Sequence, residues 1–211
     1  MRRRAILDTA AAMLVEMPVA DVSLNELSRR VGLAKSNVLR YFESREAVLL
    51  ELLDDAAVEW LAALEPRLAA GVDSAAPVRE RCGQVAATVA GTLADRPVLC
   101  DLIGAQAAVL ERNVSPEVAA RFKRTAVANT AAAAKLVRTA LPELGEARAQ
   151  RFAGAAALVA GAVWAHGQPS GAMRAAYEAD PELAVHRLDV AATLTELLDV
   201  LLLGWLARSA D

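Results

Sequence analysis

The 211-residue sequence contains only two cysteines and two histidines. Cys82 and Cys100 are too few for a disulfide framework, and no Cys/His cluster has the spacing of a metal site. We therefore interpret each cysteine as a small buried hydrophobic residue, and we expect no metal and no cofactor. The sequence also lacks a Gly-rich phosphate loop, a Gly-x-Ser-x-Gly motif and a His/Cys/acid constellation, which argues against an enzyme.

Long apolar runs are also scarce. The longest weakly polar run that we identify, Phe152 to Ala165, is interrupted by two glycines. It is shorter than the roughly 18 apolar residues of a membrane span. Only a short apolar run separates the N-terminal arginines from Asp8, which is unlike a signal peptide. We expect a cytoplasmic protein with no membrane partner.

Aromatic residues make up only 4% of the sequence, whereas hydrophobic residues make up 55% and alanine and leucine dominate. This composition predicts an all-α fold of closely packed helices. The net charge of −3 excludes a protein coated with positive charge. However, residues 1–50 carry 8 Lys/Arg against 6 Asp/Glu, and residues 51–211 carry 15 against 20. Any contact with nucleic acid must therefore come from a local patch near the N-terminus.

Apolar residues at helical spacing, together with caps and prolines, predict about nine helices. They cover residues 4–16, 24–31, 35–42, 44–66, 78–93, 98–111, 116–140, 144–166 and 180–208. Pro66 marks the end of the fourth helix, and the segment 167–171 opens the most irregular loop. The fourth helix would be long enough to bridge a small N-terminal module to the rest of the chain.

The second and third helices form a predicted helix-turn-helix. Ser23 and Glu26 have the spacing of a capping box, and Gly32 suits a left-handed C-terminal cap. A short helix after such a turn is sized to enter the major groove of B-DNA. Four apolar residues of the motif should face inward: Leu27, Val31, Val38 and Phe42.

The outward side of the third helix has the chemistry of a DNA-reading surface. Lys35, Ser36 and Asn37 offer donors and acceptors, and Asn can pair with adenine while Lys can donate to guanine. Arg40, Tyr41 and Arg45 lie further along and suit contacts with phosphates. The alternative is the solvated polar face of an ordinary helical hairpin.

Ser23, Leu27, Ser28 and the run VGLAKSNVLRYFESREAV from Val31 to Val48 resemble the DNA-binding module of the tetracycline-repressor (TetR) family of bacterial transcription regulators. The resemblance covers about residues 5–52. It implies that Ser23 caps the second helix and touches a phosphate, and that Tyr41 and Arg45 contact the DNA backbone. It also places Lys35, Ser36 and Asn37 at the groove-reading end of the third helix, and Phe42 in the core.

Two features of the module differ from this pattern or extend it. The chain has Leu39 where many family members have an aromatic residue. Arg2, Arg3 and Arg4 precede the first predicted helix, where they either reach an adjacent groove or backbone or form a solvated terminus.

The resemblance also implies that the later helices form a ligand-binding and dimerisation domain. We thus expect a helix-turn-helix domain over residues 1–46 and a helical domain over 47–211. Small residues in the eighth helix and a leucine stripe in the ninth favour a dimer interface over two core helices. The candidate interface residues are Gly154, Leu158, Gly161, Leu194, Leu198, Leu201 and Trp205.

A ligand pocket would be formed by the fifth to eighth helices. Its candidate residues, each of which can also be ordinary packing, are Cys100, Gln106, Phe122, Asn129, Trp164 and His166. The apolar surroundings predict a hydrophobic or amphipathic small-molecule effector. The sequence thus predicts a homodimeric, ligand-responsive regulator, in the first place a repressor, of a pseudo-palindromic double-stranded DNA operator. The alternative is an all-α carrier or interaction protein that kept the helix-turn-helix shape without specific DNA binding.

Overall fold

A computed structural model of the chain describes residues 2–208, which form helices joined by turns and loops, with no strand among them. Eleven α-helices lie in this range: α1 (Arg2–Glu16), α2 (Leu24–Val31), α3 (Lys35–Val38), α4 (Arg45–Gly71), α5 (Val78–Ala94), α6 (Pro97–Ala105), α7 (Pro116–Ala140), α8 (Gly145–Gly167), α9 (Gly171–Ala179), α10 (Pro181–Ala184) and α11 (Val190–Ala207). Short turns also form η1 (Val19–Asp21), η2 (Gln106–Leu110) and η3 (Pro142–Leu144). The predicted all-α fold is confirmed.

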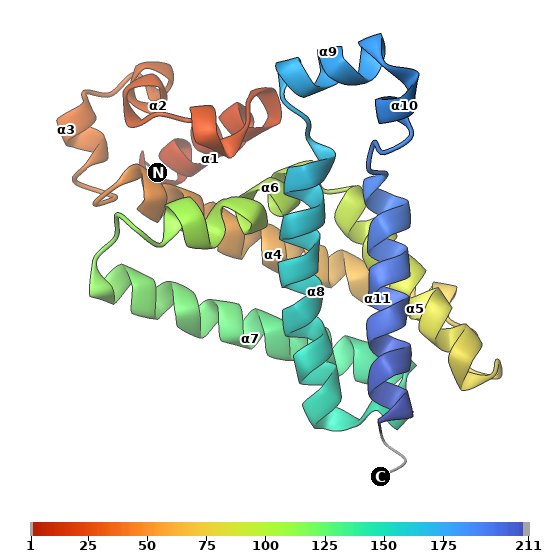
Figure 1. The fold of residues 1–211 in the computed structure, drawn as a ribbon. Coiled ribbons are helices and arrows are strands. Elements are labelled where there is room, and N and C mark those ends of the chain that lie inside the picture. The colour runs from red at the N-terminus through yellow and green to blue at the C-terminus, as the bar shows by residue number, and fades with distance from the viewer. Residues whose placement is uncertain (1, 209–211) are drawn as a thin grey trace.

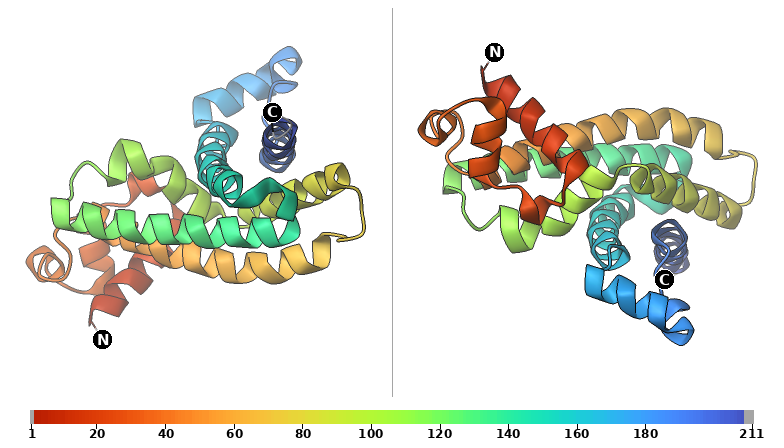
Figure 2. Two further views of the ribbon diagram at one scale, coloured as in Figure 1. Left: turned by 90° about the horizontal axis from the view of Figure 1, so that it is seen from below. Right: turned by 90° about the horizontal axis from the view of Figure 1, so that it is seen from above.

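The helices divide into a small N-terminal group and a larger body. Helices α1–α3 pack together at one end of α4 and α7 (Figure 1). Helices α8 and α11 run side by side and cross α4 and α7 (Figure 2). Helices α9 and α10 project from the end of the α8–α11 pair (Figure 1). One contiguous set of buried apolar side chains runs through both groups.

Side-chain caps begin many of these helices. Ser44 Oγ accepts the Ala47 N–H at 3.1 Å and begins α4. Ser115 Oγ accepts the Val118 N–H at 3.3 Å and begins α7, as predicted from the sequence. Because the first N–H groups of a helix have no partner within it, such caps fix where each helix begins.

Helix α4 extends beyond its predicted end. It passes through Pro66 and stops only at Gly71, so the prediction that Pro66 ends it was wrong. A proline removes one backbone N–H and disturbs the carbonyl four residues earlier, here that of exposed Ala62. Water can satisfy that carbonyl, so the helix continues. At 27 residues it spans about 40 Å.

The predicted helix over 180–208 was also wrong in its extent. Helix α10 ends at Ala184, the chain turns, and Asp189 caps α11 by accepting the Ala192 N–H at 2.9 Å. Helix α9 lies where an irregular loop was expected, and Ser170 caps it. The two short helices account for the difference between about nine expected helices and the eleven found among residues 2–208.

Helix α11 is long and apolar enough, by length and composition, to cross a membrane. It is 18 residues long with a mean hydropathy of 1.7. Its side chains Leu194, Leu198 and Leu202 are fully buried in this chain, and the helix packs on α5 and α8. A core helix has the same composition, so length and composition alone are weak grounds for a membrane span.

Both cysteines are fully buried, as predicted. Cys100 Sγ lies 3.3 Å from the carbonyl oxygen of Leu93, to which it can donate. Burial raises the pKa of Cys82 to about 11 and that of Cys100 to about 12. Among residues 2–208, no group of three or more His, Cys, Asp or Glu side chains is placed to hold a metal ion.

Candidate DNA interface and ligand cavity

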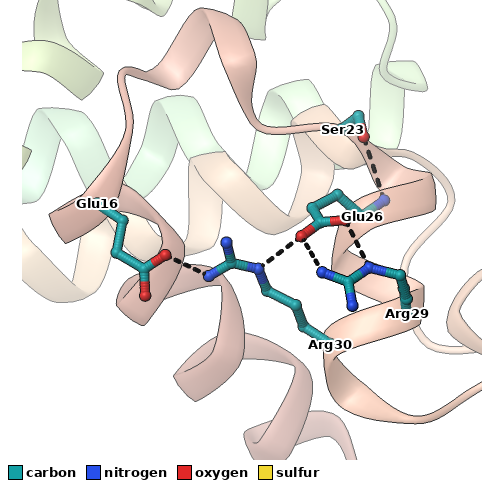
Figure 3. A network of polar contacts seen from close by, with 5 residues as sticks. All are labelled: Glu16, Ser23, Glu26, Arg29 and Arg30. Atoms are coloured by element: carbon teal, nitrogen blue, oxygen red, sulfur yellow. Dashed lines mark hydrogen bonds and ion pairs between the residues drawn. The ribbon is translucent and has the colours of Figure 1, made fainter.

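The start of α2 is held by a cap and an ion-pair network (Figure 3). Ser23 Oγ accepts the Glu26 N–H at 3.1 Å, as predicted. The Glu26 carboxylate was expected to return to the cap residue; instead it accepts hydrogen bonds from Arg29 and Arg30. Arg30 also donates to Glu16 at the end of α1, at 2.6 Å. The network therefore fixes α2 against α1.

These two guanidinium groups lower the pKa of Glu26 to about 2, so the carboxylate stays charged at any ordinary pH. At the other end of α2, Gly32 adopts φ +70° and turns the chain towards α3. A residue with a Cβ would be strained in this left-handed conformation. The predicted cap and turn of the helix-turn-helix are thus both present.

Helix α3 is shorter than predicted. It ends at Val38, whereas we expected it to reach Phe42. The backbone nevertheless stays coiled, because Phe42 N donates to Val38 O at 3.1 Å and Tyr41 N donates to the same oxygen at 2.9 Å. Val38 and Phe42 are buried as predicted, with 0% and 4% of their surface exposed. These two anchors orient the rest of the turn.

The residues predicted to read DNA surround this anchored turn. Lys35 and Ser36 are exposed and Asn37 is half-buried. Arg40 and Tyr41 are exposed beyond the end of α3. Their predicted roles towards bases and phosphates stay predictions, as does that of Ser23, whose hydroxyl already serves the α2 cap. Leu39 is 41% exposed and brings no polar group to this surface.

Arg45 has an internal role that the sequence analysis did not foresee. Its Nη1 donates to the carbonyl oxygen of Val22 at 2.7 Å, and its Nε lies 3.3 Å from a Glu46 carboxylate oxygen. The side chain is only 19% exposed. Arg45 therefore joins the first turn of α4 to the residue before the α2 cap, and its predicted phosphate contact stays a prediction.

We expected the N-terminal arginines to precede the first helix. They lie within it instead, because α1 begins at Arg2. The Arg3 guanidinium lies 4.2 Å from the centre of the Phe42 ring and pairs with Glu51 of α4. Arg4 pairs with Asp8 at 2.8 Å. Acidic and aromatic partners thus contact Arg3 and Arg4, although all three arginines are exposed. Their predicted reach to an adjacent groove or backbone stays a prediction.

A cavity of about 130 Å³ lies inside the larger body. Its walls come from α4, α5, α6, η2, α7 and α8 and are mostly apolar. Three of the six predicted ligand residues line it: Gln106, Phe122 and Asn129. The other three do not line it. Cys100 is packed in the core, Trp164 is half-buried elsewhere on α8, and His166 is exposed.

The cavity wall contains one carboxylate that was not among the predicted ligand residues. Asp54 and Trp60 of α4 line the cavity, together with Thr130 of α7. Desolvation, followed by repulsion from Asp55 and Glu51, raises the pKa of Asp54 to about 7. A signal was present, because Asp54 follows Leu50 by four residues and so falls on the apolar stripe of its helix.

The seven predicted interface residues fall into three groups by their exposure. Leu194 and Leu198 are fully buried within one chain, and Gly161 is buried against Gly104 of α6. Leu201 and Trp205 are half-buried. The Trp205 and Phe152 rings pack edge to face, with their centroids 6.2 Å apart. Leu158 is 77% exposed, and Gly154 faces open space. Of the seven, Leu158 and Gly154 are therefore the most accessible to a second chain.

Among residues 2–208, two hydrogen bonds connect the helix-turn-helix module to parts of the larger body other than α4. The Val19 N–H in η1 donates to Asp101 Oδ2 of α6 at 2.7 Å. The Ser115 N–H, just before α7, donates to Glu43 Oε1 at 2.5 Å. Helices α6 and α7 also form walls of the cavity. The two hydrogen bonds therefore join the module to α6 and to the start of α7, which both border the cavity.

A helix-turn-helix module held at one end of a larger helical body defines the class of helix-turn-helix DNA-binding proteins. Two family models match the chain: "Bacterial regulatory proteins, tetR family" over residues 6–52, and "Tetracyclin repressor-like, C-terminal domain" over residues 54–209. The chain belongs to the tetR family of bacterial regulatory proteins.

The similarity to curated relatives is confined to the N-terminal part. The chain is 45% identical over 53 residues to the HTH-type transcriptional regulator EthR of Mycobacterium tuberculosis, which is 25% of this chain and 24% of that protein. The EthR of Mycolicibacterium smegmatis is 40% identical over 53 residues, with the same coverage. The matched part thus spans about a quarter of the length of these relatives.

Solved structures show the same fold over the whole chain. The fatty acid degradation regulator FadR from Bacillus halodurans matches with a TM-score of 0.55 at 15% identity, over 94% of this chain and 97% of that one. A TetR transcriptional regulator from Rhodococcus sp. RHA1 matches with a TM-score of 0.54 at 17% identity, over 95% and 94% of the two chains. At these identities the likeness concerns the fold alone.

Proposed function

We propose that the chain is a ligand-responsive transcription regulator, in the first place a repressor, that binds a pseudo-palindromic operator as a homodimer. The observation that carries the proposal is the exposed polar surface of α3, anchored from behind by buried Val38 and Phe42. Lys35, Ser36 and Asn37 read bases in the major groove. Ser23, Arg40, Tyr41 and Arg45 bind the DNA backbone.

The proposed domain boundary lies between residues 46 and 47, inside α4. Residues 1–46 form the DNA-binding domain, and residues 47–211 form the ligand-binding and dimerisation domain. Because α4 crosses this boundary without a break, a shift of its far end is transmitted to the helix-turn-helix as a rigid movement. This continuity supports the use of α4 as one route between effector and operator.

The second chain docks on the outer faces of α8 and α11. The apolar side chains exposed there are Leu158 of α8 and Leu197 and Val200 of α11, at 77%, 40% and 60% exposure. Burying such a surface in water is favourable, and a two-fold axis then places two α3 helices in successive major grooves. Half-sites centred about 34 Å apart follow from that geometry. The buried leucines Leu194 and Leu198 support this face from within.

The effector binds in the cavity between α4 and α8. Gln106, Phe122 and Asn129 contribute to its wall from η2 and α7, and most of the remaining lining is apolar. A hydrophobic or amphipathic small molecule fits such a lining. Its binding favours a conformer with the wrong spacing between the two α3 helices and so releases the operator. Neither a catalytic activity nor a membrane partner is part of the proposal, and the regulator acts in the cytoplasm, where its operator lies.

Selection of binding sites from random duplex DNA, at a stated near-physiological salt concentration, tests the proposal directly. A recovered motif with two-fold symmetry is the expected result. Recovery of no motif by folded, dimeric protein would overturn the proposal in favour of an all-α carrier or interaction protein. A competing protein-docking role for α3 is disfavoured because Lys35 and Ser36 on its outer face, and Arg40 just beyond its end, are exposed and polar.

A further inference from the structure

The cavity is apolar except at one charged position. Its lining contains a single carboxylate, that of Asp54, and no Lys, Arg or His. Its other polar lining residues are neutral: Trp60, Gln106, Asn129 and Thr130. Two aromatic side chains, Phe122 of α7 and Trp60 of α4, offer apolar surface to a hydrophobic ligand.

Among residues 2–208, no hydrogen bond or ion pair reaches the Asp54 carboxylate, which is half-buried. Its neighbour Asp55, in contrast, lies 3.6 Å from Arg4. The charged groups that act on Asp54 are Glu51 and Asp55 on its own helix and Arg121 on α7. Arg121 is exposed, and its weak attraction does not offset the burial and the two acids.

An unpaired carboxylate in an apolar cavity is costly, and proteins usually pair it or bind a cation there. A ligand that brings a positive charge into the cavity would supply the missing partner. A neutral or anionic ligand would leave the carboxylate unpaired or add repulsion. The charge of the cavity therefore selects among the hydrophobic molecules that its walls admit.

The size of the cavity limits the ligand. Its volume of about 130 Å³ is close to the roughly 150 Å³ of an engineered protein cavity that holds benzene. The cavity by itself is therefore large enough for about one ring. A neighbouring groove between α7 and α8 shares Ile103, Gln106 and Ala157 with it and is also lined by Gly154 and Leu158 of the proposed dimer face.

We infer that the effector is a small hydrophobic amine whose ammonium group pairs with Asp54 while its apolar part packs against Phe122 and Trp60. This inference rests on the proposed function, because it names the ligand class of the proposed effector site. The ammonium group donates to the Asp54 carboxylate, and the amides of Gln106 and Asn129 offer it further acceptors.

The experiment compares two probes of the same shape, 2-phenylethylamine and 2-phenylethanol, by isothermal titration calorimetry on the full-length protein without DNA. At pH 8 the amine should bind about tenfold or more tightly than the alcohol, as a charge-assisted hydrogen bond predicts. Asp54→Asn should remove this difference. Asp55→Asn, a matched change one residue further along α4, should preserve it. Equal binding of both probes, or no binding of the amine, would overturn the inference.

A second measurement does not depend on a variant. Below the pKa of Asp54, which is about 7, an entering cation must first displace a proton, so wild-type protein should bind the amine more weakly at pH 6 than at pH 8. The alcohol should bind alike at both values. An amine affinity that is unchanged between the two would also overturn the inference. Because no DNA is present, these outcomes are independent of the operator selection that tests the proposed function.

Discussion

Gly161 allows α8 to approach α6 more closely than any other residue would. A Cβ added at Gly161 would lie 3.1 Å from the backbone of Gly104 and 3.0 Å from Ile103 Cγ2. Backbone atoms cannot move aside as a flexible side chain can, so Gly161→Ala should lower the free energy of unfolding by about 1–3 kcal/mol. Urea denaturation followed by circular dichroism measures this loss.

Gly91 provides the matched control for this change. It also lies within a helix, α5, but nothing lies within 4 Å of a Cβ added there. Gly91→Ala should therefore leave stability unchanged or raise it by up to about 1 kcal/mol, because alanine is the better helix former. If both variants lose the same stability, the close crossing of α6 and α8 is not what constrains Gly161.

Asp54 makes stability depend on pH in a predictable direction. Its pKa is about 7 in the folded chain and 3.8 in the reference state, so the folded state holds a proton that the unfolded state has released. The contribution of this group to stability therefore falls as pH rises from about 4 to about 7. Asp54→Asn removes this dependence, and its advantage over wild type should grow between pH 5 and pH 8 in urea denaturation. Identical pH profiles would contradict the assignment.

At the scale of the element, the helices that the sequence predicted best combine a cap with an apolar stripe. Ser23 and Ser115 marked the starts of α2 and α7, and Gly32 marked the turn before α3. Helix α9 buries no residue, and α10, whose start at Asp180 was predicted, buries none that would mark its separation from α11. The length of α4 could not be read from Pro66, because the carbonyl that the proline disturbs is free to bind water.

Helix α3 carries the prediction that separates base reading from backbone binding. Asn37→Ala should relax the sequence preference in a binding-site selection, at a cost of about 1–3 kcal/mol for its preferred base pair. Tyr41→Phe should weaken binding to all sequences alike and leave the motif unchanged. The two variants are compared in one selection at one salt concentration. If they alter affinity and motif in the same way, the two kinds of contact have been assigned wrongly.

At the scale of the whole molecule, the sequence predicted part of the cavity but not its charge. Gln106, Phe122 and Asn129 were identified as polar or bulky residues on apolar faces, and they line the cavity. Cys100 and Trp164 fit the same pattern but pack elsewhere, because a periodic pattern shows which face is buried and not which neighbour covers it. Only the packing of five helices and one turn shows that Asp54 shares the cavity with them.

The hydrogen bond between Asp101 and Val19 gives the molecule a direct connection from cavity to DNA-binding module. Asp101 lies on α6 between Leu99 and Ile103, which both line the cavity, and it accepts the N–H of Val19 at 2.7 Å. A ligand that displaces α6 must therefore move η1 or break this bond. Unlike α4, this route reaches the module without passing through the boundary helix.

Asp101→Ala should uncouple the two sites without removing either of them. Allosteric coupling typically changes affinity by a factor of about 5–150, and the variant should bring this ratio closer to one. The ratio is measured as operator affinity with and without saturating 2-phenylethylamine. Asp95→Ala, an exposed acid between α5 and α6, is the control and should keep the wild-type ratio. If Asp101→Ala also keeps the full ratio, coupling does not pass through the contact between α6 and η1, and α4 and the Ser115–Glu43 hydrogen bond are the remaining routes.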